Sequence, residues 1–146
     1  TELYRELATY PVKGAYVFLD ACFSGGYKSA APLLAQKGVR VVPKVGLPQG
    51  KTLSFSSSSG DQTSSVYHDK KQGYYTYFLI KTIKDARGDL SMKDLFERTS
   101  AAVKKATAMI GKMQEPQCMV SPTWFGWESL RLETPVEPAP VAPQGE

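Results

Sequence analysis

The sequence predicts an α/β fold in which a mostly parallel β-sheet is flanked by helices. The first observation is a short, continuous apolar run, Ala15–Leu19, with glycines on both sides; this pattern is typical of a strand buried on both faces. The second is a pair of apolar patterns with helical spacing later in the chain, over 73–83 and 91–110. The third is their order, because strands that come mostly before helices, with crossovers between them, favour a layered α/β arrangement.

The first part of the chain is expected to hold a short helix followed by strands. An apolar face predicts a helix over Glu2–Ala8, which Pro11 stops. Further strands are predicted at Val39–Val42 and Thr52–Phe55, because glycines and prolines punctuate these β-branched and apolar runs. The next segment, Ser56–Ser65, is dominated by Ser, Gly and Thr, and by composition alone it fits a flexible linker.

The second part is expected to be mainly helical. The dense apolar segment over 73–83 predicts a buried helix, and Gly88 suits its C-cap. Ser91 and Asp94 resemble a capping box at the start of the next helix. That helix has one apolar face at spacings of three and four residues, formed by Leu95, Phe96, Thr99, Val103, Ala106 and Ile110.

The C-terminal segment is expected to close the core and then to run into a tail. The stretch Met119–Leu132 contains Trp124, Phe125 and Trp127 and supplies large apolar side chains. Beyond it, residues 133–146 alternate proline with small residues and glutamate, so we expect an extended tail that does not pack. The sequence therefore divides into one domain over 1–132 and a Pro-rich tail over 133–146.

Composition excludes several classes of function. The chain of 146 residues has 18 Lys and Arg against 14 Asp and Glu, a net charge of +4, but its lysines are scattered and form no stripe of the kind that binds nucleic acid. No apolar run approaches the roughly 18 residues that a bilayer span needs, so no membrane partner is expected. The two cysteines are far apart in the sequence, and we expect reduced thiols in a cytoplasmic protein.

The sharpest chemical signal follows the first predicted strand. Cys22 comes at the carboxyl end of that strand, just before Gly25 and Gly26. Ligands of open α/β sheets bind outside the carboxyl ends of the strands, and glycines let a substrate backbone come close. Asp20 is expected to point to the same side as Cys22, since the two are separated by one residue. Cys22 is thus a candidate nucleophile, with a buried core thiol as the alternative, and the charge of Asp20 indicates a cationic partner.

The segment Asp20–Gly26, with the sequence Asp-Ala-Cys-Phe-Ser-Gly-Gly, resembles the catalytic cysteine motif of the caspase-like peptidases, most closely that of bacterial caspase-domain proteins and metacaspases. The resemblance extends in order over roughly residues 3 to 120. Its other blocks are Phe55–Ser64, Gly73–Leu79, Asp89–Leu95 and Glu115–Gln117. It implies the three-layer caspase-like fold, here without its N-terminal part, and the activity of a cysteine endopeptidase.

The resemblance implies roles for four residues. Cys22 takes the position of the nucleophile. Asp20 takes the position that, in metacaspases, paracaspases and clostripain-like relatives, binds an arginine or lysine at P1, the residue before the cleaved bond. Asp61 and Gln62 belong to a loop that faces the same S1 pocket, although Asp61 also fits an ordinary Gly-Asp turn. The expected substrates are proteins or peptides with P1 Arg or Lys, because this chain lacks an arginine at 64–66, where animal caspases place one for P1 aspartate.

The catalytic histidine is missing from its expected place. The one histidine, His68, follows Cys22 in a polar stretch and is expected to be an exposed loop residue, whereas in the family the histidine lies upstream of the cysteine. The chain also lacks an initiator Met. Two interpretations stay open: a processed subunit whose partner, an N-terminal chain of the same precursor, carries the histidine, or a truncated piece that cannot catalyse.

Other chemistries fit the sequence less well. The Ser-rich segment lacks the Gly-x-x-x-x-Gly-Lys pattern of a phosphate-binding loop, no Gly-x-Ser-x-Gly marks a serine hydrolase, and no cysteine–histidine cluster has zinc spacing. No cofactor is expected; some metacaspases depend on calcium, but no calcium site is assignable here. The alternative to an enzyme is a caspase-like scaffold or interaction module, which the missing histidine favours and the presence of Cys22 and Asp20 disfavours.

Overall fold

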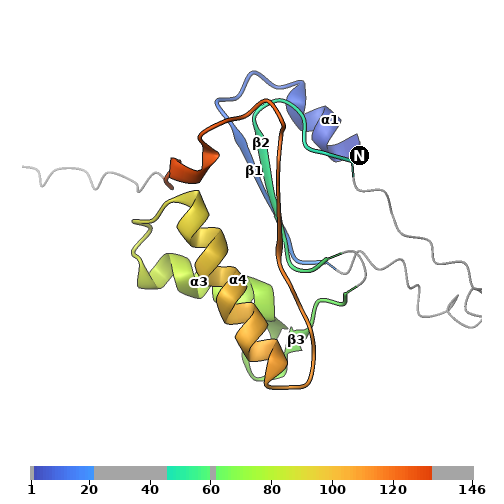
Figure 1. Cartoon of the computed structure of the whole chain (residues 1–146), viewed down its shortest axis with the longest axis vertical. Helices are drawn as coiled ribbons and strands as arrows, with labels where there is room; N and C mark the ends of the chain where they lie inside the picture. The colour runs from blue at the N-terminus through green and yellow to red at the C-terminus, as the bar shows by residue number, and fades with distance from the viewer. Residues whose placement is uncertain (1, 22–45, 60–61, 133–146) are drawn as a thin grey trace, which may run out of the picture.

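A computed structural model describes residues 2–21, 46–59 and 62–132 of the chain (Figure 1). Cys22, Asp61, the strand predicted at Val39–Val42 and the tail over 133–146 lie outside the described residues, so the expectations about them stay predictions. The described part combines a mixed β-sheet with α-helices on both of its faces. The predicted α/β class is therefore confirmed.

The main sheet is built around β2 (Thr52–Ser56), which is buried along its whole length. β1 (Ala15–Leu19) runs parallel to β2, and β5 (Gln117–Val120) runs antiparallel on the other side, which gives the order β1-β2-β5. A second sheet pairs β3 (Val66–Tyr67) with β4 (Gln72–Gly73). Because β1 and β2 are parallel, their carboxyl ends meet at one edge of the main sheet.

β1 is less buried than its apolar sequence predicts. Its side chains alternate between half-buried and exposed, and Tyr16 and Phe18 are 39% and 38% exposed. The reason is its place in the sheet, because within the described residues β1 has a strand partner only on the β2 side. The prediction of a strand buried on both faces is therefore wrong for the part of the molecule that the structure describes.

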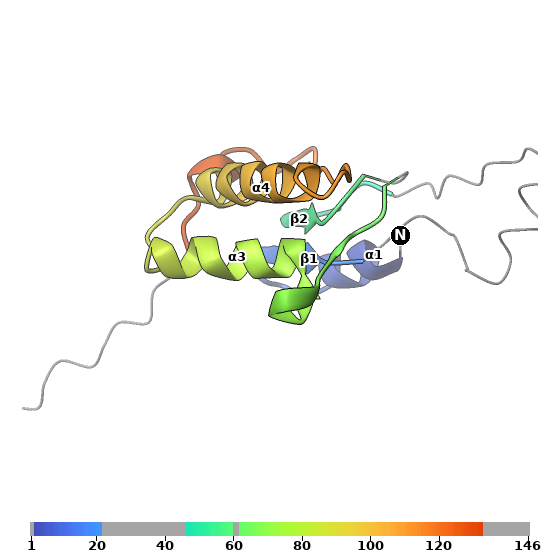
Figure 2. The same ribbon diagram turned by 90° about the horizontal axis from the view of Figure 1, so that it is seen from below.

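Helices cover both faces of the sheet (Figures 1 and 2). α3 (Tyr74–Asp85) and α4 (Met92–Ala108) pack against each other on one face, and α1 (Glu2–Ala8) lies on the opposite face. α1 is attached through Tyr4, whose buried hydroxyl donates a hydrogen bond of 2.8 Å to Ser54 Oγ in β2. The sheet is thus the middle of three layers.

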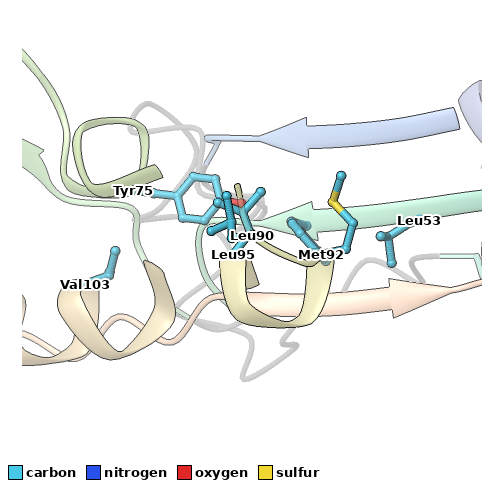
Figure 3. Close-up of a cluster of buried hydrophobic side chains, with 7 residues drawn as sticks. Leu53, Tyr75, Leu90, Met92, Leu95 and Val103 are labelled. Atoms are coloured by element: carbon cyan, nitrogen blue, oxygen red, sulfur yellow. The ribbon is translucent and has the colours of Figure 1, made fainter. Parts of the chain in front are cut away.

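The core lies between β2 and the pair of helices α3 and α4. Its buried side chains come from these elements and from the loop that joins the helices: Leu53, Phe55, Tyr75, Leu90, Met92, Leu95 and Val103. Figure 3 shows six of them, labelled, in the space between the strands and the helices. Trp124 and Trp127 pack against the same cluster, as predicted for the C-terminal aromatic segment.

α3 matches its predicted position, although it is only partly buried. Tyr74 and Tyr75 are buried at its start, while Ile80 is exposed on its outer side. The chain leaves the helix through Gly88, which has a left-handed φ of 75° and donates a 2.9 Å hydrogen bond to the Ile83 carbonyl. The C-cap itself is Ala86, and Arg87, with a φ of 52°, takes the left-handed position next to it. The prediction of Gly88 as the C-cap is therefore wrong by two residues, although Gly88 takes part in ending the helix.

α4 begins where the sequence predicts, but it ends at Ala108, before Ile110, the last residue of the predicted apolar face. Ser91 is the N-cap, and its hydroxyl accepts a 3.1 Å hydrogen bond from the Asp94 amide. The helix stops at Ala108, so Ile110, which continues the apolar spacing, is exposed beyond the helix. Phe125, predicted to help close the core, is 86% exposed. Both predictions are wrong for one reason: an apolar residue stays on the surface once the chain has turned away from the core.

The described residues of the Ser-rich segment, 56–59 and 62–65, are a packed part of the structure, which corrects their interpretation as a linker. Ser56 is the last residue of β2, and Ser57 and Ser58 are almost completely buried. Their side chains are small enough to fit beside the sheet, and their hydroxyls take part in hydrogen bonds. Ser58 bonds within the segment, whereas Ser57 also reaches the Ala21 carbonyl 36 positions away, and composition alone does not reveal such a contact.

Candidate active site

The edge at which β1 and β2 end is the candidate active site. Asp20 and Ala21 directly follow β1, and Ser57 directly follows β2. The backbone pairing continues beyond the strands, because the Ser57 N–H donates a 2.8 Å hydrogen bond to the Leu19 carbonyl. Open α/β sheets place their ligands at this edge. The chain runs from here directly into Cys22, the predicted nucleophile.

Asp20 is exposed, and its carboxylate binds the start of α3. Asp20 Oδ2 accepts a 3.2 Å hydrogen bond from the backbone N–H of Thr76 and a 2.6 Å hydrogen bond from Thr76 Oγ1. Thr76 is the third residue of α3, and the N-cap position is Gly73, which has no side chain to cap the helix. Asp20 therefore supplies, from the end of β1, the acceptor that an N-cap side chain usually supplies. Its negative charge also suits the positive end of the helix dipole.

Gly73 leaves the space that the Asp20 carboxylate occupies. A Cβ added to Gly73 would overlap Asp20 Oδ2 and would lie 3.0 Å from Asp20 Cγ. Any side chain at this position therefore displaces the carboxylate. Glycine is thus needed for the Asp20 carboxylate to keep this position, while the backbone itself, with a φ of −67°, is open to all residues.

The carbonyl of Ala21 is held by serine hydroxyls. Ser57 Oγ and Ser64 Oγ each lie 3.3 Å from this oxygen, and the two hydroxyls hydrogen-bond to each other. Each hydroxyl has one proton to donate, and Ser58 Oγ lies 3.3 Å from Ser64 Oγ, so the three serines form one hydroxyl cluster around this carbonyl. The peptide group that joins Ala21 to Cys22 thus has its oxygen fixed by residues of the Ser-rich segment.

Two glutamines tie this segment to the loop that precedes β5. Gln62 Oε1 accepts a 2.7 Å hydrogen bond from the Glu115 N–H. Gln114, only 1% exposed, accepts a 2.8 Å hydrogen bond from the Ser65 N–H and donates one of 3.0 Å to the Ser57 carbonyl. Gln114 carries no signal in the sequence, because its partners, 49 and 57 positions away, lie beside it only in the fold.

Tyr75, the second residue of α3, lies in the core. Burial raises the pKa of its hydroxyl well above the ordinary value, and the charges of Asp20 and Cys118 add to this effect. The hydroxyl is therefore neutral over the physiological range. Within the described residues it has no hydrogen-bond partner.

Of the four residues with predicted site roles, the structure describes Asp20 and Gln62, while Cys22 and Asp61 lie outside the described residues. Asp20 lies at the predicted edge of the sheet with an exposed carboxylate. Gln62 is half-buried, and its amide oxygen accepts a hydrogen bond from the Glu115 N–H. The roles of all four residues in catalysis and substrate binding stay predictions.

His68 is exposed in the short 3₁₀ helix His68–Lys70, as predicted. Within residues 2–21, 46–59 and 62–132, no group of three or more His, Cys, Asp and Glu side chains could hold a metal ion. None of the helices in the same ranges has the length and apolar character that a bilayer span requires.

Cys118 is a free thiol in β5, opposite Phe55 of β2, and it is half-buried against the core. It lines a surface groove of about 450 Å³ together with side chains that include Phe96, Trp127 and Glu128. Burial, and secondly the charge of Glu128, raise the pKa of the Cys118 thiol to about 11. At neutral pH this residue is thus a protonated thiol and a poor nucleophile.

Cys118 is therefore expected to react slowly with iodoacetamide in the folded protein. Only the thiolate reacts, and raising the pKa from 9.0 to about 11 lowers the thiolate fraction about a hundredfold near pH 7.5. The rate should rise about tenfold per pH unit until the pH reaches the pKa. Mass spectrometry of the Cys118 peptide measures the rate, with urea-unfolded protein as the control. Equal rates in folded and unfolded protein would contradict the prediction.

A mixed sheet with helices on both faces is the layout of an α/β domain, in which ligands bind at the carboxyl ends of the strands. The caspase-domain family model matches residues 1–123, which include every described strand and all three described α-helices. The chain therefore belongs to the caspase-domain family, a family of cysteine peptidases, and the resemblance seen in the sequence is confirmed. A search of curated proteins found no match to this chain.

Proposed function

We propose that the protein is a cysteine endopeptidase that cleaves peptide bonds after arginine or lysine. The observation that carries this proposal is the exposed Asp20 carboxylate, which Thr76 holds at the edge where β1 and β2 end. A fixed, exposed carboxylate at a ligand-binding edge suits a cationic side chain. Cys22 is two residues further along the chain, and the family match supports the peptidase class.

In the proposed reaction Cys22 is the nucleophile. A histidine takes the thiol proton, and the thiolate attacks the carbonyl carbon of the peptide bond, while backbone N–H groups stabilise the resulting oxyanion. The C–N bond then breaks, and the leaving amine takes the proton from the histidine. Water finally hydrolyses the thioester, which releases the carboxylic acid product and returns the free thiol. The reaction needs no cofactor.

Asp61 and Gln62 are proposed to complete the S1 pocket around Asp20. Asp61 would add a second carboxylate for the P1 cation. Gln62 has its amide oxygen engaged by Glu115, so it offers a substrate mainly N–H donors, which suit a carbonyl better than a cation. Asp20 is thus the main determinant of P1 selectivity in this proposal.

The partner in this proposal is an N-terminal chain of the same precursor that supplies the histidine, in a cytoplasmic enzyme with reduced thiols. Support comes from β1, on which the exposed Tyr16 and Phe18 offer an apolar surface for such a chain. A denaturing intact-mass spectrum of the natively purified protein tests this. A second chain with a His-Gly segment would support the partner, and a single 16.0 kDa species would contradict it.

Labelling with a peptidyl acyloxymethyl ketone tests the peptidase proposal on the full-length protein. A probe with P1 arginine is expected to label Cys22 and to react faster than the same probe with P1 aspartate. Cys22→Ala should abolish labelling, and Cys118→Ser should leave it unchanged. Asp20→Asn should slow the P1 arginine probe on the order of a hundredfold, because an ion pair is lost. A faster reaction with P1 aspartate would overturn the proposed selectivity.

The second candidate function is a catalytically inactive caspase-like scaffold or interaction module. The observation that favours it is that the single histidine of the chain, His68, follows Cys22 and is exposed in a 3₁₀ helix. Slow and equal labelling of Cys22 and Cys118 by the P1 arginine probe would support the scaffold. Selective labelling of Cys22 would support the enzyme.

A further inference from the structure

We infer that Thr76 is a positioning residue that sets the selectivity for a basic P1 side chain, with Gly73 providing the space it requires. The inference rests on the proposed role of Asp20 in the S1 pocket. In it, Thr76 contacts no substrate and acts only through the Asp20 carboxylate.

Two hydrogen bonds from one residue fix the orientation of this carboxylate. The N–H of Thr76, at 3.2 Å, and its hydroxyl, at 2.6 Å, converge on the same oxygen of Asp20, Oδ2. A carboxylate held by one donor can still turn about the bond to its Cβ, and a second donor on the same oxygen opposes this rotation. Thr76 itself is fixed, because it belongs to the first turn of α3.

The two oxygens of the Asp20 carboxylate differ in their hydrogen bonds. In the described part of the chain both hydrogen bonds to the carboxylate end on Oδ2, which leaves Oδ1 for a ligand. The side chain is exposed, so a cation can approach it. Thr76 thus presents one carboxylate oxygen in a constant position at the edge where β1 and β2 end.

Gly73 makes this arrangement possible. The carboxylate lies against the backbone of Gly73, where an added Cβ would overlap Oδ2 and lie 3.1 Å from Oδ1. Gly73 ends β4 and precedes the first residue of α3. The carboxylate is therefore positioned by the ends of regular elements, which hold a group more precisely than a free loop does.

A helix cap alone would explain the contact without any effect on substrates, and the two explanations differ in what they predict. A cap stabilises α3, so its loss lowers the melting temperature and leaves the choice of substrate unchanged. A positioning residue affects the binding of basic P1 side chains in particular. Ser91, the N-cap of α4, offers a control in which a cap is lost far from Asp20 in the sequence.

The test compares peptide substrates with P1 arginine and P1 citrulline, which has a similar shape and no charge, on the full-length protein. Thr76→Val is expected to raise KM for the arginine peptide about tenfold, because a hydrogen bond to a charged group is lost. The kcat for the arginine peptide, and both KM and kcat for the citrulline peptide, should stay unchanged. Thr76→Ser keeps the hydroxyl and should restore the wild-type KM. Ser91→Ala should lower the melting temperature without changing the ratio of the two substrates.

The outcomes separate this inference from the proposed function. If the wild type does not prefer arginine to citrulline, or if Asp20→Asn leaves that preference unchanged, the proposed role of Asp20 fails and the inference falls with it. If Asp20→Asn removes the preference while Thr76→Val keeps it, the role of Asp20 stands and only the inference about Thr76 is overturned. A loss of preference in Thr76→Val that Thr76→Ser does not restore also overturns it.

Discussion

Replacing Phe55 with alanine is expected to lower the free energy of unfolding by about 3–5 kcal/mol. Phe55 is 1% exposed in the central strand, and its ring lies 5.5 Å from that of Phe18, 5.2 Å from that of Phe96 and 6.3 Å from that of Trp127. These partners come from β1, from α4 and from the C-terminal segment. The truncation therefore leaves a cavity where several elements meet, and no single element can move to fill it.

Urea denaturation followed by tryptophan fluorescence measures this loss. Domains of this size are stable by only about 5–15 kcal/mol, so the midpoint of unfolding should fall markedly. Phe125→Ala is the matched control, because it removes the same atoms from a side chain that is 86% exposed. We expect its effect to stay within about 0.5 kcal/mol. Similar losses for both variants would contradict the assignment of Phe55 to the centre of the core.

The second large effect is expected for Gln114→Leu, which should cost about 2–5 kcal/mol. Leucine is similar in size to glutamine, so the cost comes from hydrogen bonds and not from a cavity. The Ser65 N–H and the Ser57 carbonyl lose their bonds to Gln114, and both residues are buried. A buried backbone group without a partner costs about 1–3 kcal/mol. The Ser-rich segment should also become less firmly attached to the loop before β5.

Hydrogen exchange at the Ser65 amide tests this prediction together with the unfolding midpoint. The amide should exchange faster in Gln114→Leu than in the wild type. Gln117→Leu is the control, because the Gln117 amide is half-buried and makes one local hydrogen bond of 2.9 Å to the Glu115 carbonyl. We expect it to cost less than about 1 kcal/mol. If both variants are equally destabilised, the loss of stability in Gln114→Leu does not come from the two hydrogen bonds that Gln114 makes to Ser65 and Ser57.

Elements with local signals could be predicted from the sequence. α4 is the clearest case, because Ser91 caps its first turn and the apolar spacing marks the face that packs on the core. β2 and α1 were also predicted at nearly their observed bounds. In each case the residues that determine the element are close together in the sequence, so a short window contains the relevant information.

Burial was harder to predict, because it depends on what covers an element. The apolar run of β1 would have the same sequence at the middle or at the edge of a sheet, yet Tyr16 and Phe18 are substantially exposed. Ile110 and Phe125 continue apolar patterns beyond the point where the chain leaves the core. The Ser-rich segment shows the opposite case, in which small polar residues are buried and hydrogen-bonded both to one another and to distant groups.

The candidate site could be predicted in part. The strand pattern and the family resemblance place Asp20 correctly at the edge of the sheet, while the roles of Cys22 and Asp61 stay predictions. The bond between Asp20 and Thr76 could not be foreseen, because it joins residues 56 positions apart. The same holds for Gln114, since an isolated glutamine gives no indication of which distant backbone groups it will bridge.

The pairing of β2 with both β1 and β5 also determines when the sheet can form during synthesis. β1 is made before β2, but the second partner appears only near the end of the described chain, where Val120 pairs with Leu53. Until then the nascent chain carries a strand with one unpaired edge, which is a template for association with other chains. A strand that is buried along its whole length in the folded protein thus has an unpaired edge during synthesis, until β5 has been made.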